Sequence, residues 1–150
     1  MSRSFQGRPV LPGETRGCAI VSKLGFNTLA VYLKCIMRNS RRAISGDRNN
    51  PDIFGRDLTH KIICMPCSIG STTAGLAFMN LAKMDVQPKA LLFSDRIDSL
   101  AAAGIVLSTF WAGKRIIAVD GLGVEFLDHV KHDDLIKISL DGTVIVSDPQ

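Results

Sequence analysis

The sequence predicts an α/β domain with three layers, β/β/α, in which flanking helices cover a mostly parallel central sheet. Its 150 residues have the size of one domain, and 46% of them are hydrophobic, which is enough to form a core without disulfides. Strand-like and helix-like segments alternate between residues 61 and 119, and this order indicates right-handed parallel crossovers. We therefore expect a single domain over residues 1–150, with residues 1–12 loosely ordered.

The first 60 residues predict strands and loops. Residues 1–15 contain two glycines and two prolines and predict a loop with a short extended piece. Residues 16–23 are typical of a strand, and the apolar, β-rich residues 27–37 predict a further strand or a turn. Residues 40–57 are polar and basic and predict a long surface loop, a kind of segment that is often functional.

From residue 60 onward, short apolar runs and segments of helical periodicity alternate regularly. Pro88 ends the first predicted helix, and Gly113 closes the second. Ser94 and Asp95 are N-cap candidates for the second helix, with Asp98 in its first turn. The predicted elements are a strand at 61–65, a turn at 66–71, a helix at 72–84, a strand at 90–93, a helix at 97–111, a strand at 115–119 and a β-hairpin at 135–140 and 143–147.

The formal net charge of +4 comes from the part of the chain before residue 60. Aromatic residues are not interleaved with these arginines, so we expect no nucleic-acid partner. The basic segments are either solvated loops or a rim that attracts an acidic substrate or partner. No apolar run approaches the roughly 18–20 residues that a bilayer span requires, so we expect no membrane partner. The first residues contain no apolar signal segment, which predicts a cytoplasmic protein with free thiols.

Two of the four cysteines, Cys64 and Cys67, form a C-x-x-C pair. Such a pair can be a redox site or half of a zinc site, but a zinc ribbon needs a second pair, which the sequence lacks. Cys64 lies within the apolar run 62–65, which predicts a buried strand. We interpret Cys64 as a core residue and expect no metal ligand on this chain; a thiol-redox or zinc role is the alternative.

The segment with the clearest chemical potential is 65–75, which follows a predicted buried strand and opens a predicted helix. Ligands in α/β sheets bind at the carboxyl ends of strands, and the free N–H groups of a helix N-terminus attract anions. Gly70 would let the backbone approach a ligand, and the next three residues carry hydroxyls. The lysine of a P-loop is missing. Composition alone leaves two interpretations open, a small-anion site and a well-capped helix without a ligand.

A resemblance to a known family favours the site. The run Gly70-Ser-Thr-Thr, after a proline-containing strand end, resembles the Gly-Ser-Ser turn of the aconitase swivelling domain. It is more closely similar to the small subunit of the aconitase X family, whose pattern is Pro-Ser-Gly-Arg-Gly-Ser-Ser-Ser-Gly. Further segments resemble the family in the same order along the chain, namely residues 46–58, 86–90 and 98–104. The order holds from about Gly13 to Val146.

The resemblance implies an aconitase-like swivelling β/β/α domain, with a central mostly parallel sheet or barrel. Family members are hydro-lyases, which remove water from a hydroxylated acid such as cis-3-hydroxy-L-proline or mevalonate 5-phosphate. Their site lies between this kind of small subunit and a large subunit that carries an iron or iron–sulfur centre. The resemblance therefore implies a heterodimer with a large-subunit partner, a small hydroxy-acid substrate, no cofactor bound by this chain alone, and no activity without the partner.

The resemblance also assigns candidate site residues. The family's serine at the Gly-Ser position corresponds to Ser71, which would act as the base that removes the proton α to the carboxylate. Helix N-terminal N–H groups would have to favour its charged form. The candidate substrate-binding residues around it are Ser68, Gly70, Thr72 and Thr73.

The turn departs from the family pattern at the position of its arginine. Ser68-Ile69 stands where the family usually has Gly-Arg, and an arginine there could contact an anionic group of the substrate. We therefore expect cis-3-hydroxy-L-proline or a related substrate rather than mevalonate 5-phosphate. The alternatives are a mevalonate 5-phosphate dehydratase subunit and a non-enzymatic module that binds a small anion.

Overall fold

The computed structural model of the chain describes residues 1–70 and 73–150. The strands in these residues are β1 (Ser2–Gln6), β2 (Arg8–Leu11), β3 (Thr15–Val21), β4 (Phe26–Asn27), β5 (Ile62–Met65), β6 (Ser68–Ile69), β7 (Ala90–Phe93), β8 (Ile117–Asp120), β9 (Leu135–Ile138) and β10 (Thr143–Ser147). The helices in these residues are α1 (Thr28–Met37), α2 (Ala74–Lys83), α3 (Ser99–Ala112) and α4 (Val124–His129).

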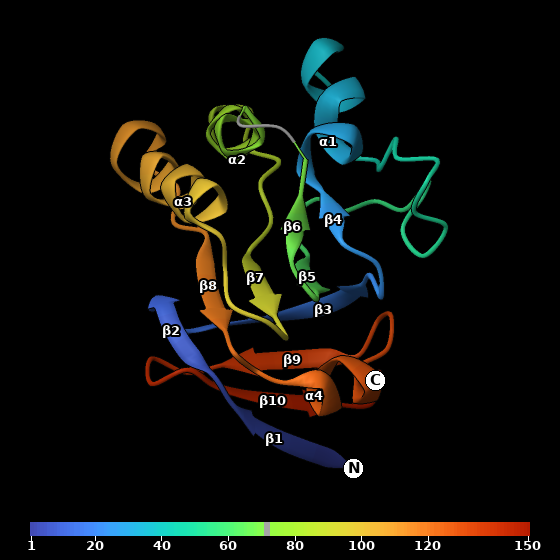
Figure 1. Ribbon diagram of the computed structural model, residues 1–150, viewed down its shortest axis with the longest axis vertical. Helices are drawn as coiled ribbons and strands as arrows, with labels where there is room; N and C mark the ends of the chain where they lie inside the picture. The colour runs from blue at the N-terminus through green and yellow to red at the C-terminus, as the bar shows by residue number, and fades with distance from the viewer. Residues whose placement is uncertain (71–72) are drawn as a thin grey trace.

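The described strands form an eight-stranded sheet in the order β1-β10-β9-β3-β5-β7-β8-β2, and β4 pairs with β6 separately. The segment β3-β5-β7-β8 is parallel, and the other pairs of the large sheet are antiparallel. Figure 1 shows three layers, with α1, α2 and α3 on one side of the parallel strands and β9, β10 and β1 on the other. This arrangement confirms the predicted α/β fold of the β/β/α kind, with a mostly parallel centre and flanking helices.

The central strands form two cores, one on each face. Every residue of β5, β7 and β8 is buried, as is typical of parallel strands that are covered on both sides. On the helical side, the rings of Tyr32 and Phe78 lie 6.2 Å apart. On the other side, Phe5 meets Phe126 of α4 edge to face at 5.4 Å. Burial of each such side chain stabilises the fold by roughly 1.5–3 kcal/mol.

Residues 28–37 form helix α1, so the prediction of a strand or turn at 27–37 was wrong. Asn27 is the N-cap residue, and its side-chain oxygen accepts a hydrogen bond from the Ala30 N–H at 3.1 Å. Val31, Tyr32 and Cys35 are buried on one face of the helix. Packing at helical spacing therefore outweighs the β-propensity of the individual residues. Helix α4 was not predicted, and no helix within residues 1–70 and 73–150 is long and apolar enough to cross a membrane.

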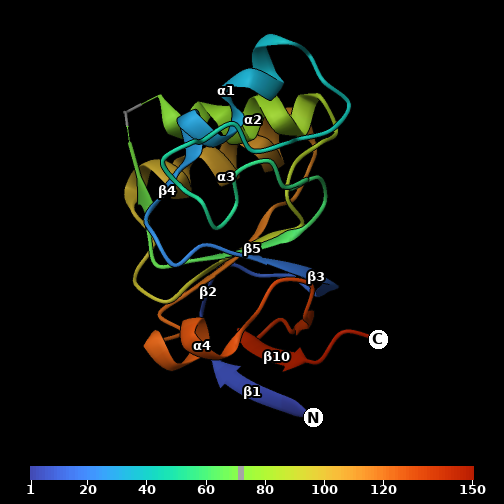
Figure 2. The same ribbon diagram turned by 90° about the vertical axis from the view of Figure 1, so that its right-hand side faces the viewer.

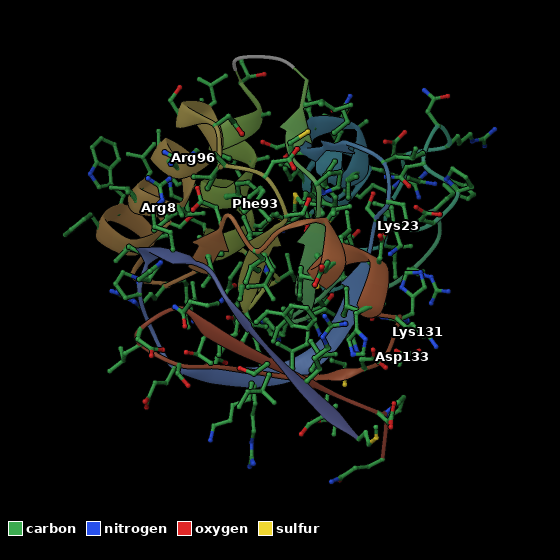
Figure 3. The ribbon with its side chains drawn as sticks, turned by 60° about the horizontal axis from the view of Figure 1, so that its bottom comes forward. Arg8, Lys23, Phe93, Arg96, Lys131 and Asp133 are labelled. Atoms are coloured by element: carbon green, nitrogen blue, oxygen red, sulfur yellow. The ribbon has the colours of Figure 1, made fainter. Side chains whose placement is uncertain are left out.

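Strands β1 and β2 occupy most of a segment for which the sequence predicted a loosely ordered loop. β1 pairs along β10, and β2 pairs with β8, so both partners lie more than a hundred residues away in sequence. The Arg8 guanidinium donates two hydrogen bonds, of 2.9 and 2.6 Å, to the buried Asp120 carboxylate. Burial would raise the pKa of Asp120, but the hydrogen bonds from Arg8 and the Ile97 N–H lower it overall. Figure 3 shows Arg8 on the same side of the molecule as Arg96.

Candidate functional site

The first turns of α1, α2 and α3 meet beyond the carboxyl ends of the parallel strands, next to the β4–β6 pair. They line a cavity of about 230 Å³, which we call the helix-start cavity. Its lining comes from the first turns of the three helices and from β6, and includes Thr28, Ser68, Gly70, Ala74, Asp98 and Leu100. Figure 2 shows β4 and the starts of these helices at one end of the helical layer. Ligands of α/β sheets are commonly found at this position.

Gly70 brings the end of β6 against the start of α1. Its φ angle is +118°, a conformation that side chains other than glycine rarely adopt. A Cβ atom at Gly70 would lie 2.8 Å from Oδ1 of Asn27, the N-cap of α1. Only a glycine therefore allows this close approach, and the predicted 66–71 turn contains a short strand, β6, that pairs in parallel with β4.

Asp98 links β6 to α3. The Ser68 hydroxyl donates a hydrogen bond to Oδ1 of Asp98. Oδ2 of Asp98 accepts the N–H groups of Leu100 and Ala101, both at 3.0 Å. Asp98 is thus the N-cap of α3, so the prediction that the cap is Ser94 or Asp95 was wrong. Because the Ser68 proton is directed to Asp98, the Ser68 oxygen can interact with a ligand only as an acceptor.

The starts of α2 and α3 are held together by two glycines. A Cβ atom at Gly75 would lie 2.4 Å from the Leu100 carbonyl oxygen, and one at Gly104 would lie 2.2 Å from the Gly75 carbonyl oxygen. Both distances are far below van der Waals contact with rigid backbone atoms, so the two helices touch backbone to backbone. Gly104 lies within the predicted helix at 97–111, but helical periodicity does not reveal this contact, which gives the helix-start cavity one of its walls.

The structure describes three of the five predicted site residues. Ser68 and Gly70 line the helix-start cavity, and Thr73 is the exposed N-cap residue of α2. Ser71 and Thr72 lie outside the described residues. Two residues of the family-like segment 46–58 lie elsewhere: Asp47 is buried and accepts the Asn49 N–H at 3.0 Å, and Arg48 lines a different cavity.

The C-x-x-C pair has the environment of structural thiols. Cys64 is fully buried in β5, and burial strongly raises its pKa. The pKa of Cys67 is also raised, first by burial and then by the carboxylates of Asp95 and Asp98. Within residues 1–70 and 73–150, no group of three or more His, Cys, Asp or Glu side chains is arranged to hold a metal ion. These observations favour the core interpretation of Cys64 over the redox or zinc alternative.

The raised pKa values predict slow thiol chemistry at neutral pH. A raised pKa keeps the reactive thiolate scarce until the pH exceeds the ordinary cysteine value of about 8.5. We expect Cys64 and Cys67 to react with iodoacetamide much more slowly in the native chain than in urea at pH 7.5, with the rate for Cys67 rising as the pH increases. Mass spectrometry of the labelled peptides measures both rates, with the partly exposed Cys18 as internal reference. Rapid formation of a Cys64–Cys67 disulfide would contradict this prediction.

Comparison with known proteins agrees with the fold. The family model described as the aconitase X swivel domain matches residues 4–146. The crystal structure of Thermococcus kodakaraensis aconitase X (holo-form) is 24% identical and superposes with a TM-score of 0.79 over 96% of this chain and 98% of that chain. A UPF0107 protein solved by solution NMR is also 24% identical, with a TM-score of 0.74 over 95% of this chain and 97% of that chain. No curated protein matches the sequence. The chain therefore belongs to the aconitase X swivel domain family.

Proposed function

We propose that the chain is the small subunit of an aconitase X-type hydro-lyase, a dehydratase that removes water from a hydroxylated acid. The observation that carries this proposal is the match of the aconitase X swivel-domain model over residues 4–146. The helix-start cavity supports it, because the first turn of α2 lines this cavity and a helix N-terminus favours the carboxylate of such a substrate.

In the proposed reaction, the substrate carboxylate would bind at the first turn of α2, since the first N–H groups of a helix have no carbonyl partner four residues earlier within the helix. Ser71 directly follows Gly70 at this helix start and would accept the proton α to the carboxylate as the hydroxyl leaves. Ser68, Gly70, Thr72 and Thr73 would orient the substrate. An iron or iron–sulfur centre on the large subunit would supply Lewis-acid chemistry to the departing hydroxyl.

The charges around the helix-start cavity favour cis-3-hydroxy-L-proline, or a related substrate, over mevalonate 5-phosphate. Asp98 is the charged residue among those described in the lining, and no lysine or arginine accompanies it. Ile69, which stands where the family usually has arginine, also lines the cavity and is half exposed. A phosphate group would find no cationic side chain on this wall, whereas a single carboxylate needs only the helix N–H groups.

Helix α3 supports the proposal of a large partner. It carries no charged residue, and its outward side is apolar, with Phe110 78% and Trp111 74% exposed. A helix that is hydrophobic on all sides is typical of a buried helix. The exposed apolar residues begin at Leu100, which lines the helix-start cavity, and continue through Val106 to Phe110. A large subunit that completed the site would therefore also cover this side of α3.

Co-expression with a large-subunit partner tests the proposal. We expect the purified heterodimer to dehydrate cis-3-hydroxy-L-proline, as followed by NMR of substrate and product, and neither subunit to do so alone. A Phe110→Glu variant should fail to co-purify, because it puts a charge into the covered apolar face. The matched control is Leu140→Glu, at an exposed leucine in the β9–β10 hairpin, which should co-purify normally. A chain that binds small carboxylates alone and forms no complex would instead be a small-anion-binding module.

A further inference from the structure

A second cavity, of about 590 Å³, lies between α1 and the loop of residues 38–61 that joins α1 to β5. Figures 1 and 2 show this loop beside α1. We call this space the loop cavity; its volume is within the roughly 300–1,000 Å³ of small-molecule sites. Thr28, at the start of α1, lines the helix-start cavity, whereas Lys34 and Arg38, near its end, line the loop cavity. The two sets of residues are roughly 9–15 Å apart along the helix axis.

The lining of the loop cavity is strongly basic. Lys34, Arg38, Arg42 and Arg48 contribute to it, and no carboxylate does so among the described residues. Arg42 is neutralised, because its guanidinium donates a hydrogen bond of 2.9 Å to Asp57. In the part of the chain that the structure describes, the other three cationic side chains form no hydrogen bond or ion pair. Three exposed cationic residues without a partner among the described residues thus line one cavity.

The end of α1 accounts for only part of this charge. Cations near a helix C-terminus are favoured by the helix dipole, which explains Lys34 and Arg38. It does not explain Arg48, which comes from the middle of the loop. The neighbouring Asp47 is buried outside the lining of the cavity, and in the described residues it forms no ion pair with Arg48. Two segments of the chain therefore bring positive charge to the same cavity.

We propose that the loop cavity binds a phosphorylated small molecule, whose phosphate is held by Lys34, Arg38 and Arg48. A guanidinium group matches two phosphate oxygens at once, and three cations suit the multiple charge of a phosphate better than the single charge of a carboxylate. Phe54, which is 49% exposed, lines the same cavity and offers an apolar wall to the rest of the ligand. The lining is confined to residues 34–55, which favours a small molecule over a nucleic acid, since a nucleic acid needs an extended basic track. The loop cavity shares no lining residue with the helix-start cavity, so either proposal can be contradicted without the other.

Titration of the full chain with pyrophosphate tests the site. Calorimetry at constant ionic strength is expected to show saturable binding, and amide NMR shifts should centre on residues 34–55. Arg38→Gln and Arg48→Gln should each weaken the affinity at least about tenfold, because each removes a charge-assisted hydrogen bond. Citrate, a carboxylate of comparable charge, is expected to bind at least about tenfold more weakly than pyrophosphate.

Arg41→Gln is the matched control, because Arg41 is exposed in the same loop and does not line the loop cavity. This variant should keep the affinity within about twofold, as an exposed charge outside the site contributes little. Absence of saturable binding would overturn the proposal, and so would shifts centred on residues 68–75. An equal loss of affinity in the Arg41 and Arg48 variants would show diffuse attraction and no site. Tighter binding of an oligonucleotide through the same residues would also overturn it.

Discussion

Replacement of Ser71 with alanine is expected to lower the kcat of the heterodimer roughly a thousandfold, with little change in KM and with the complex intact. The reason is that the proposed base would be lost while the groups that bind the substrate carboxylate remain, and a positioned base contributes about 10²–10⁴ in rate. Steady-state kinetics with cis-3-hydroxy-L-proline measure the change, and size-exclusion chromatography verifies the complex.

The matched control removes a neighbouring hydroxyl. Thr73→Ala changes the exposed N-cap residue of α2, a predicted substrate-binding position. We expect it to raise KM with kcat within about fivefold, because uniform binding is weakened without loss of the base. A Ser71→Ala enzyme that kept more than a tenth of its kcat would assign the base to another residue. An equal loss of kcat in the Ser71→Ala and Thr73→Ala enzymes would show that Ser71 has no catalytic role beyond that of its neighbour.

The part of the fold that local patterns encode could be predicted from the sequence. The strand at 90–93 coincides with β7, because four consecutive apolar residues bounded by polar segments suit a strand that is buried on both faces. Helices α2 and α3 begin and end within two residues of their predicted bounds, since apolar periodicity and the closing Gly113 are local signals. By contrast, β1 and β2 depend on partners at the other end of the chain, and no local pattern reveals them.

Part of the candidate site could be predicted in the same way. Gly70 and Ser68 lie where the strand-to-helix pattern placed them, next to the helix-start cavity. The role of Asp98 as cap and as acceptor for Ser68 depends on a contact between segments thirty residues apart. The approach of Gly75 to Gly104 is likewise a contact between two helices. Sequence periodicity describes the faces of one element, and it carries no information on how closely two elements meet.

Replacement of Gly104 with alanine is expected to lower the free energy of unfolding by about 3 kcal/mol. Alanine is normally favoured over glycine within a helix by about 1 kcal/mol, so a loss of stability in this variant would show that packing outweighs helix propensity. The added methyl group would lie 2.2 Å from the Gly75 carbonyl oxygen, and a backbone atom cannot move aside as a flexible side chain can. Urea denaturation followed by circular dichroism measures the change.

The stability control is Ala103→Val, at the neighbouring exposed position of α3, which also adds bulk. It should cost no more than about 1 kcal/mol, because only the helix propensity of an exposed residue changes. If Gly104→Ala were as stable as the original chain, α2 and α3 could not be in backbone contact. If the contact holds, the methyl group must push the helices apart at Gly75 and Leu100, both of which line the helix-start cavity. The heterodimer would then lose activity together with stability, because the residues that pack α2 against α3 also form the wall of the cavity that would hold the substrate.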